Sequence, residues 1–356
     1  MSSFAQLSPV IHQQLLKGVV IPAHPLTLNA DGTMNEAAQR RLTRYYMAAG
    51  AGGVAVGVHT TQFEIRQPQH NLYARVLQLA AEEADKAGNP LFIKIAGICG
   101  PTTQAIEEAA LALQTGYHLG LLSLGGLSNY TEAELLLHVA AIARIIPVFG
   151  FYLQPAVGGR LLSYDFWRRM ADIPGVYAIK IAAFNRYQTI DVVRAVIESD
   201  RRNEIALYTG NDDNIVADLL TPYRFDVNGQ TIEKYFTGGL LGHWAVWTKT
   251  AVTLLERIQQ TRGKKNADYT ELLQTGITVT DMNAALFDVT HQFHGCIAGI
   301  HQVLYEQGLL PSIRCLNPAE TLSPGQLEEL NRVRKAYPEW IDDDFVHTFI
   351  GADTNL

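Results

Sequence analysis

Short apolar runs recur along the chain, and each is followed by a longer segment with helical periodicity. The runs are rich in Val, Ile and aromatic residues without polar alternation, so they predict strands that are buried on both faces. Eight strands are expected, at 18–24, 53–59, 91–98, 119–124, 148–153, 176–182, 205–209 and 240–245. The intervening segments predict helices at 35–49, 69–87, 103–115, 132–144, 165–171, 189–198, 212–220 and 247–260.

Helix-terminal signals support this alternation. Thr131 and Glu134 form the pattern of a capping box, in which each side chain bonds the backbone amide of the other, at the start of the fourth helix. Gly50, Gly88 and Gly116 stand where helices are expected to end, as C-capping glycines do.

Strict alternation of strands and helices predicts a parallel sheet, either closed into a barrel or open and doubly wound. Eight units favour the barrel. An open dinucleotide-binding sheet would have GxGxxG after its first strand, whereas this strand ends in Pro22-Ala-His-Pro25. We therefore predict a (β/α)8 barrel with a C-terminal helical appendage.

Three segments are expected: an N-terminal segment at 1–17, the barrel at 18–262 and a C-terminal helical extension at 263–356. A polar stretch at 221–237 is inserted before the eighth strand. The extension predicts helices alone, including one from Thr280 to about Gln307 and a last one that begins at Ser323.

Composition narrows the class of protein. The 356 residues are 47% hydrophobic and 18% charged, with a net charge of −7, so nucleic acid is not an expected partner. The three cysteines are widely spaced and fit neither a disulfide framework nor a zinc knuckle. Without a visible signal peptide or membrane-length apolar stretch, a cytoplasmic protein is expected. Neither a cofactor nor a metal is expected.

Barrel enzymes place their reactive groups at the carboxyl ends of the strands, which directs attention to Lys180. This lysine interrupts an otherwise apolar strand, and burial lowers the pKa of a lysine toward the neutral amine that attacks ketones. A lysine paired with a neighbouring carboxylate would give the same pattern. Lys94 also interrupts a strand, and periodicity alone does not choose between the two.

Other polar residues are expected at the same ends of the strands. Tyr152 ends the strand before that of Lys180, and its phenol could shuttle protons, although a barrel-rim aromatic would look the same. Thr60 and Thr61 offer hydroxyls and amides for a carboxylate, or they are an ordinary Thr-Thr pair. Weaker candidates are Asp212 and Asp213, which could only cap a helix, and Asp288, His291, His294 and His301, which fit packing better than metal binding.

The segment from about Gly18 to Val246 resembles the dihydrodipicolinate synthase / N-acetylneuraminate lyase family of pyruvate-dependent barrel enzymes. The likeness includes Gly57-Val-His-Thr-Thr61, Tyr152-Leu-Gln-Pro155, Ala178-Ile-Lys180 and Gly210-Asn-Asp212. Its most specific element is the spacing of 28 residues between Tyr152 and Lys180, which is the family's spacing between its phenol and its Schiff-base lysine. The resemblance therefore favours Lys180 over Lys94.

The departures from the family pattern concern specificity. The family's Gly-(Ser/Thr)-Thr-Gly-Glu reads His59-Thr-Thr-Gln-Phe63 here. Leu127 replaces the relay tyrosine of the synthase, and Val157 replaces its arginine, with Arg160 three residues on. Trp244 stands where the family has a smaller aliphatic residue.

Together these features predict a lyase or aldolase that forms a Schiff base between Lys180 and a 2-oxo acid, with Tyr152 as proton shuttle. The expected substrate-binding residues are Thr60, Thr61, Arg160, Gly210 and Trp244. A hydro-lyase acting on a deoxy-keto sugar acid by the same lysine is an alternative, and so is a 2-oxo acid sensor without turnover. A homo-oligomer, dimer or tetramer, is expected.

Overall fold

The computed structural model describes residues 3–155 and 158–353, and its main sheet has eight strands in the order β1-β10-β7-β6-β5-β4-β3-β2. A parallel bridge between Ala23 and Ala55 joins the two ends of this order. The fold is therefore a (β/α)8 barrel, as predicted. The strands are β1 Val20–Pro22, β2 Gly53–Val56, β3 Ile93–Ile98, β4 Leu119–Ser123, β5 Val148–Leu153, β6 Val176–Ala182, β7 Ala206–Thr209 and β10 Gly238–Leu241.

The chain forms two compact units with interleaved sequences. Unit 1 consists of Met1–Val19 and Ile93–Leu240, and unit 2 consists of Val20–Phe92 and Leu241–Leu356. All three limits between the units fall inside 18–262, the stretch expected to be one barrel domain.

Unit 1 contains five consecutive parallel strands, β3 to β7, with helices in between. Its helices are α1 Pro9–Lys17, α4 Thr102–Gln114, α5 Glu132–Ile142, α6 Tyr164–Ala171, α7 Arg186–Ile197 and α8 Ile215–Leu220. Each of α4 to α7 contacts the next, so they form one layer beside the strands. The predicted capping box of Thr131 and Glu134 is confirmed at the start of α5.

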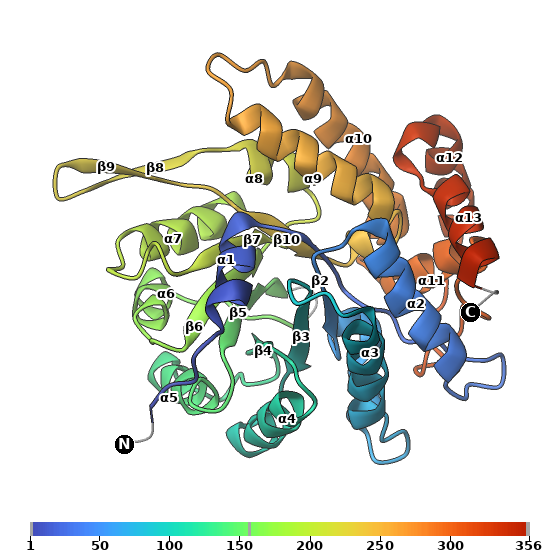
Figure 1. The fold of residues 1–356 in the computed structure, drawn as a ribbon, viewed down its shortest axis with the longest axis horizontal. Helices are drawn as coiled ribbons and strands as arrows, with labels where there is room; N and C mark the ends of the chain where they lie inside the picture. The colour runs from blue at the N-terminus through green and yellow to red at the C-terminus, as the bar shows by residue number, and fades with distance from the viewer. Residues whose placement is uncertain (1–2, 156–157, 354–356) are drawn as a thin grey trace. The chain divides into compact units, whose positions relative to one another are not determined.

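The inserted stretch in unit 1 forms an antiparallel hairpin of β8, Tyr223–Val227, and β9, Gln230–Lys234. Figure 1 shows this ribbon running alongside α7 and extending past it. Asn228 and Gly229 connect the strands with φ of 53° and 79°, the left-handed conformation of a type I′ turn. The sequence predicted an insert here but no strands.

Unit 2 contains β1, β2 and the helices that follow β10. Its helices are α2 Glu36–Ala49, α3 Tyr73–Ala87, α9 Thr248–Arg262, α10 Thr270–Leu286, α11 Cys296–Glu306, α12 Gln326–Ala336 and α13 Asp343–Asp353. Gly50 and Gly88 end α2 and α3 in the left-handed conformation, as predicted.

The prediction of one helix from Thr280 to about Gln307 is wrong. The helix is broken between α10 and α11, where Asp288, Gln292 and Phe293 have positive φ angles. The buried carboxylate of Asp288 accepts hydrogen bonds from the Gly295 amide and the Ser323 hydroxyl, which stabilise the break. Apolar periodicity continues through this break, so the sequence pattern did not reveal it.

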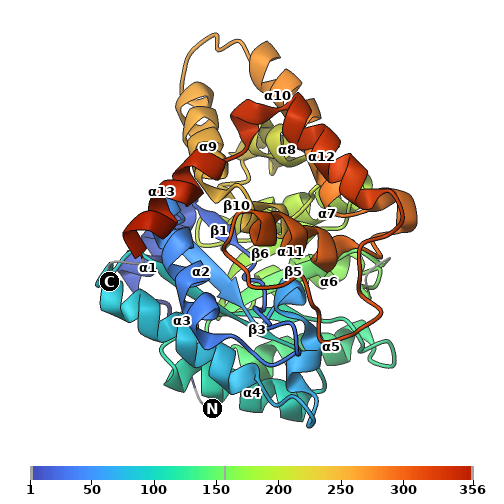
Figure 2. The same ribbon diagram turned by 90° about the vertical axis from the view of Figure 1, so that its right-hand side faces the viewer.

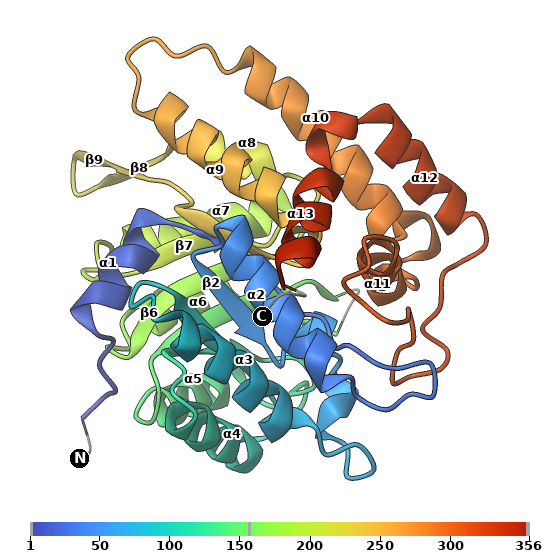
Figure 3. The ribbon, with the colours of Figure 1, turned by 45° about the vertical axis from the view of Figure 1, so that its right-hand side comes forward.

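The last helices pack within unit 2, where α12 lies alongside α10 (Figures 2 and 3). α12 begins at Gln326 after Gly325 and not at the expected Ser323, whose hydroxyl bonds Asp288. The sequence did not predict α13. Within 3–155 and 158–353, no helix is long and apolar enough to span a membrane.

Candidate functional site

Lys180 is the fifth of the seven residues of β6, in unit 1, and it is partly exposed whereas the other six are buried. Its neighbour in β5 is Phe151, and its Nζ lies 4.5 Å from the centroid of the Phe151 ring. On the other side, at the end of β7, a Cβ on Gly210 would lie 2.4 Å from the Lys180 Cε. Only glycine therefore fits at position 210 beside the lysine side chain.

The pKa of Lys180 is lowered to about 8, mainly because burial disfavours the ammonium form. The negative charge of Asp212 acts in the opposite direction and holds the pKa up. Asp212 is itself buried, in the loop that follows β7. With a pKa of about 8, roughly a tenth of the amine is neutral at pH 7. Such a lysine can act as a nucleophile.

The loop that carries Gly210 and Asp212 is fixed by the residue between them. The Asn211 side chain accepts a hydrogen bond from the Phe184 amide at 3.0 Å and donates to Asp218 at 2.9 Å. Because Phe184 follows β6, these bonds tie the loops after β6 and β7 together. The bonds hold Gly210 and Asp212 in place on either side of Asn211.

The rival lysine, Lys94, is buried, on β3. A Cβ on Gly116 would lie 3.3 Å from its Nζ, and Gly116 precedes β4, at the amino ends of the strands. Reactive groups of barrel enzymes lie at the opposite end. The structure therefore favours Lys180, in agreement with the family spacing.

The structure does not bring Tyr152 beside Lys180. Val148 pairs with Val176, but a register shift then pairs Phe149 with Ala178, so Phe151 and not Tyr152 lies opposite Lys180. Alternate residues of a strand face opposite sides. The Tyr152 ring packs against Trp167 of α6, with centroids 4.9 Å apart, and its hydroxyl accepts a hydrogen bond from the Leu162 amide at 3.4 Å. Its role as proton shuttle stays a prediction that this packing does not favour.

Arg160 lies in unit 1 and is bound to the loop after β4. Its Nη1 donates to the carbonyls of Leu127 and Tyr130 at 2.9 and 2.8 Å. Leu127, at the position of the family's relay tyrosine, is buried. Val157 lies outside the described residues. Arg160 therefore orders the loop after β4, and a contact with substrate stays a prediction.

Thr60 and Thr61, which are adjacent in unit 2, differ in the hydrogen bonds that their hydroxyls make. The Thr61 hydroxyl accepts hydrogen bonds from the amides of Gly57 and Val58 and donates to the His24 carbonyl at 2.6 Å. It thereby links the ends of β1 and β2. The buried Thr60 hydroxyl has no partner among the residues described, so it is the one with capacity left for a ligand.

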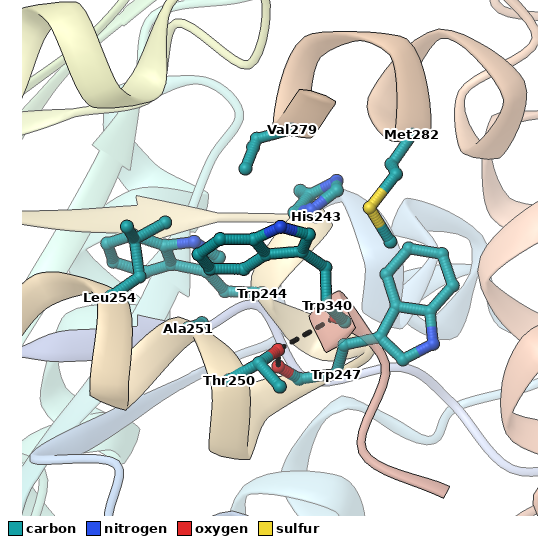
Figure 4. A pocket seen from close by; sticks show the side chains of 9 residues that line it. All are labelled: His243, Trp244, Trp247, Thr250, Ala251, Leu254, Val279, Met282 and Trp340. Atoms are coloured by element: carbon teal, nitrogen blue, oxygen red, sulfur yellow. Dashed lines mark hydrogen bonds between the residues drawn. The ribbon is translucent and has the colours of Figure 1, made fainter. Parts of the chain in front are cut away.

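Trp244, also in unit 2, is buried at the wall of a cavity of about 20 Å³ (Figure 4). The cavity is lined by His243, Trp244, Trp247, Thr250, Ala251, Leu254, Val279, Met282 and Trp340. This space is large enough for one water molecule and too small for a sugar. Trp244 lines this cavity together with residues of α9 and α10, and its contact with substrate stays a prediction.

The C-terminal histidines do not share one helix face. His291 lies in the break after α10, where its Nδ1 donates to Asp288 at 2.6 Å, and His301 is buried in α11, where its Nδ1 donates to the Ile313 carbonyl. In the part of the chain that the structure describes, no three His, Cys, Asp or Glu side chains are grouped to hold a metal.

The sequence did not identify Phe151 as the neighbour of Lys180, and it left Asp212 as a helix cap. Asn214, and not Asp212, stands at the N-cap of α8. The position of Asp212 in the sequence could have indicated a role in the site. It comes two residues after Gly210, at the carboxyl end of β7, the strand next to β6 with Lys180.

Comparison with known proteins places this chain in a family. The model of the dihydrodipicolinate synthetase family matches residues 16–222. A 4-hydroxy-tetrahydrodipicolinate synthase of Ralstonia nicotianae is 26% identical over 209 residues, which are 58% of this chain and 65% of that protein. The chain thus matches just under two thirds of the length of this curated relative.

Solved structures share the fold at low sequence identity. A pyruvate complex of the dihydrodipicolinate synthase of Acinetobacter baumannii aligns with a TM-score of 0.72 at 19% identity, covering 89% of this chain and 98% of that one. An N-acetylneuraminate lyase of Fusobacterium nucleatum aligns with a TM-score of 0.70 at 17% identity, covering 92% and 100%. On the family match, which covers more than half of its residues, this chain belongs to the dihydrodipicolinate synthetase family.

Proposed function

We propose that this protein is a lyase or aldolase that forms a Schiff base between Lys180 and a 2-oxo acid. The observation that carries the proposal is a partly buried lysine in a barrel strand, with its pKa lowered to about 8, beside a glycine whose position has no room for a side chain. The family membership supports the same chemistry.

In the proposed reaction, the neutral amine of Lys180 adds to the ketone carbon, and the resulting carbinolamine loses water to give an iminium ion. When the carbon–carbon bond beyond C3 breaks, its electron pair moves into the iminium and forms an enamine. Protonation at C3 restores the iminium, and water then releases the 2-oxo acid and the free lysine. The reverse sequence forms the bond.

These steps need a group that gives and takes protons near the lysine. We assign this role to Asp212, because its carboxylate acts electrostatically on Lys180 and its loop is fixed by Asn211. The phenol of Tyr152 is the alternative given by the family resemblance. Thr60 is the candidate for the substrate carboxylate, and a cytoplasmic location stays a prediction.

Reduction with borohydride tests the covalent step. Incubation with pyruvate and borohydride should add a pyruvate-derived mass to the peptide that contains Lys180. Lys94→Met should leave this labelling intact, and Lys180→Met should abolish it. Labelling of Lys94 in place of Lys180, or no adduct with any 2-oxo acid, contradicts the proposal.

Labelling alone does not separate a lyase from a hydro-lyase or a sensor, because all three would form the same iminium. Product analysis with keto sugar acids separates them. Cleavage to pyruvate and an aldehyde supports the lyase, loss of water supports the hydro-lyase, and an adduct without any product supports the sensor.

A further inference from the structure

The hairpin of β8 and β9 is a two-stranded ribbon with open edges. β8 pairs with β9 and with no other strand that the structure describes. The ribbon is anchored at its base, where the Tyr223 hydroxyl bonds Asp218 and the Lys234 ammonium donates to the Arg202 carbonyl at 2.6 Å. Beyond this base it projects past α7 (Figure 1). An unpaired two-stranded ribbon is marginally stable, and open strand edges bind further strands.

The register of the hairpin shows which backbone groups face outward. Val227 and Gln230 flank the two-residue turn, so they form a hydrogen-bonded pair, and such pairs alternate along an antiparallel ladder. Asp226 pairs with Thr231, and Arg224 pairs with Glu233. In both of these pairs the backbone groups do not hydrogen-bond each other across the hairpin. The amides and carbonyls of Arg224 and Asp226 therefore lie on the open edge of β8.

The sequence of β8, Tyr-Arg-Phe-Asp-Val, is complementary to itself in an antiparallel arrangement. If two copies pair about Phe225, each Arg224 lies opposite the Asp226 of the other copy. These two residues are also the ones whose amides and carbonyls face outward, so the backbone register and the charges agree. No such charge match exists for β9 paired about Ile232, because Thr231 would then face Glu233.

We propose that the open edge of β8 is an interface between two copies of this chain, which pair antiparallel about Phe225 into a four-stranded sheet. A twofold contact of this kind uses the same surface on both partners and closes on itself. Arg224 retains donors for this contact, since only its Nε bonds Glu233, and the Gly229 amide occupies only one oxygen of Asp226.

Disulfide trapping tests the register. In a Cys99→Ser background, which leaves the two buried native cysteines, Phe225→Cys should form a disulfide-linked dimer on mild oxidation, because directly opposed non-bonded residues have Cβ atoms about 5 Å apart. Val227→Cys is the matched control, since its two copies would be about 13 Å apart. Absence of the Phe225→Cys dimer, or an equal yield from Val227→Cys, overturns the proposal.

Proline substitutions test the edge without any cross-link. Asp226→Pro removes an amide from the β8 edge, and Thr231→Pro removes the amide directly opposite, from the β9 edge. In sedimentation analysis of the full chain, Asp226→Pro should weaken dimerisation about tenfold or more, and Thr231→Pro should leave it near the wild-type value. Equal effects of the two variants, or a wild type that stays monomeric at the highest concentration measured, overturn the proposal.

Discussion

At the scale of single residues, the proposed chemistry depends on the groups that surround the Lys180 amine. Burial lowers the pKa of Lys180, and the charge of Asp212 limits how far it falls. Phe151 and Gly210 shape the space beside the side chain, one with a ring and the other by having no Cβ. Each contribution can be changed separately.

The first prediction concerns pH. In the proposed reaction the neutral amine is the nucleophile, so the rate of adduct formation with pyruvate should rise with pH and level off above about 8. Asp212→Asn removes a negative charge that stabilises the ammonium, so the inflection should move to lower pH. Rates of borohydride trapping across the pH range measure both profiles. An unchanged inflection in Asp212→Asn would show that the carboxylate does not act on the lysine.

The second prediction separates the two candidate proton carriers. Exchange of the pyruvate methyl protons in D2O, followed by NMR, reports proton transfer at C3 without knowledge of the full substrate. Asp212→Asn should slow this exchange by about two to four orders of magnitude, as loss of a general acid–base does. Tyr152→Phe should slow it less than about tenfold, because its hydroxyl bonds Leu162 on the helix side of β5. The reverse ranking would restore the phenol as the proton carrier.

The third prediction concerns the space beside the lysine. Gly210→Ala would place a methyl group 2.4 Å from the Lys180 Cε, so the side chain must move and trapping should slow strongly. Gly263→Ala, where the nearest other atom lies 3.9 Å away, is the control and should trap at the wild-type rate. Equal trapping rates would show that the lysine can move freely at this point.

At the scale of elements, the turn after β2 contains two adjacent threonines for which we expect different roles, one in stability and one in ligand binding. Thr61→Val should lower the free energy of unfolding by about 1–3 kcal/mol, because it leaves the buried amides of Gly57 and Val58 and the His24 carbonyl without their partner. Thr60→Val should change stability much less and weaken carboxylate binding instead. Denaturant unfolding and pyruvate titration measure the two effects, and a greater loss of stability in Thr60→Val would contradict this assignment.

The elements themselves were largely predictable from the sequence, because burial on both faces gives the strands an unbroken apolar pattern. β5 and β6 have the predicted bounds. Elements whose form depends on distant partners were not predictable. The break after α10 depends on bonds between Asp288 and Ser323, and the hairpin depends on a turn at Asn228 and Gly229 within a polar stretch.

The side of the strand to which a side chain points was the main feature of the site that could not be predicted from the sequence. The spacing of 28 residues places Tyr152 opposite Lys180 only if β5 and β6 pair without irregularity. Tyr177 is an extra residue in β6, and it shifts the register by one, which moves Tyr152 to the opposite face. The position of Lys180 itself was predictable, because a lysine in an apolar strand is conspicuous whatever the register.

At the scale of the whole molecule, a further expected outcome concerns substrate choice. Leu127 offers no phenol at the position of the synthase's relay tyrosine, and Arg160 is bound to carbonyls of the loop after β4. We expect poor condensation of pyruvate with aspartate semialdehyde, and activity on 2-oxo acids with a polyol or aromatic distal part. Steady-state assays with both classes measure this. Efficient condensation with the semialdehyde would show that the missing groups are not needed.

The interleaving of the two units has a consequence for the order of events on the ribosome. Residues 20–92 belong to unit 2 but are made before most of unit 1, and the rest of unit 2 begins only at Leu241. At about 5–20 residues per second, the intervening stretch takes roughly 7–30 s to synthesise. The chain of unit 1 is therefore complete before the chain of unit 2 is. Proteolysis of stalled nascent chains should find 20–92 cleavable until residues well beyond 241 have emerged, and early protection of that segment would contradict this order.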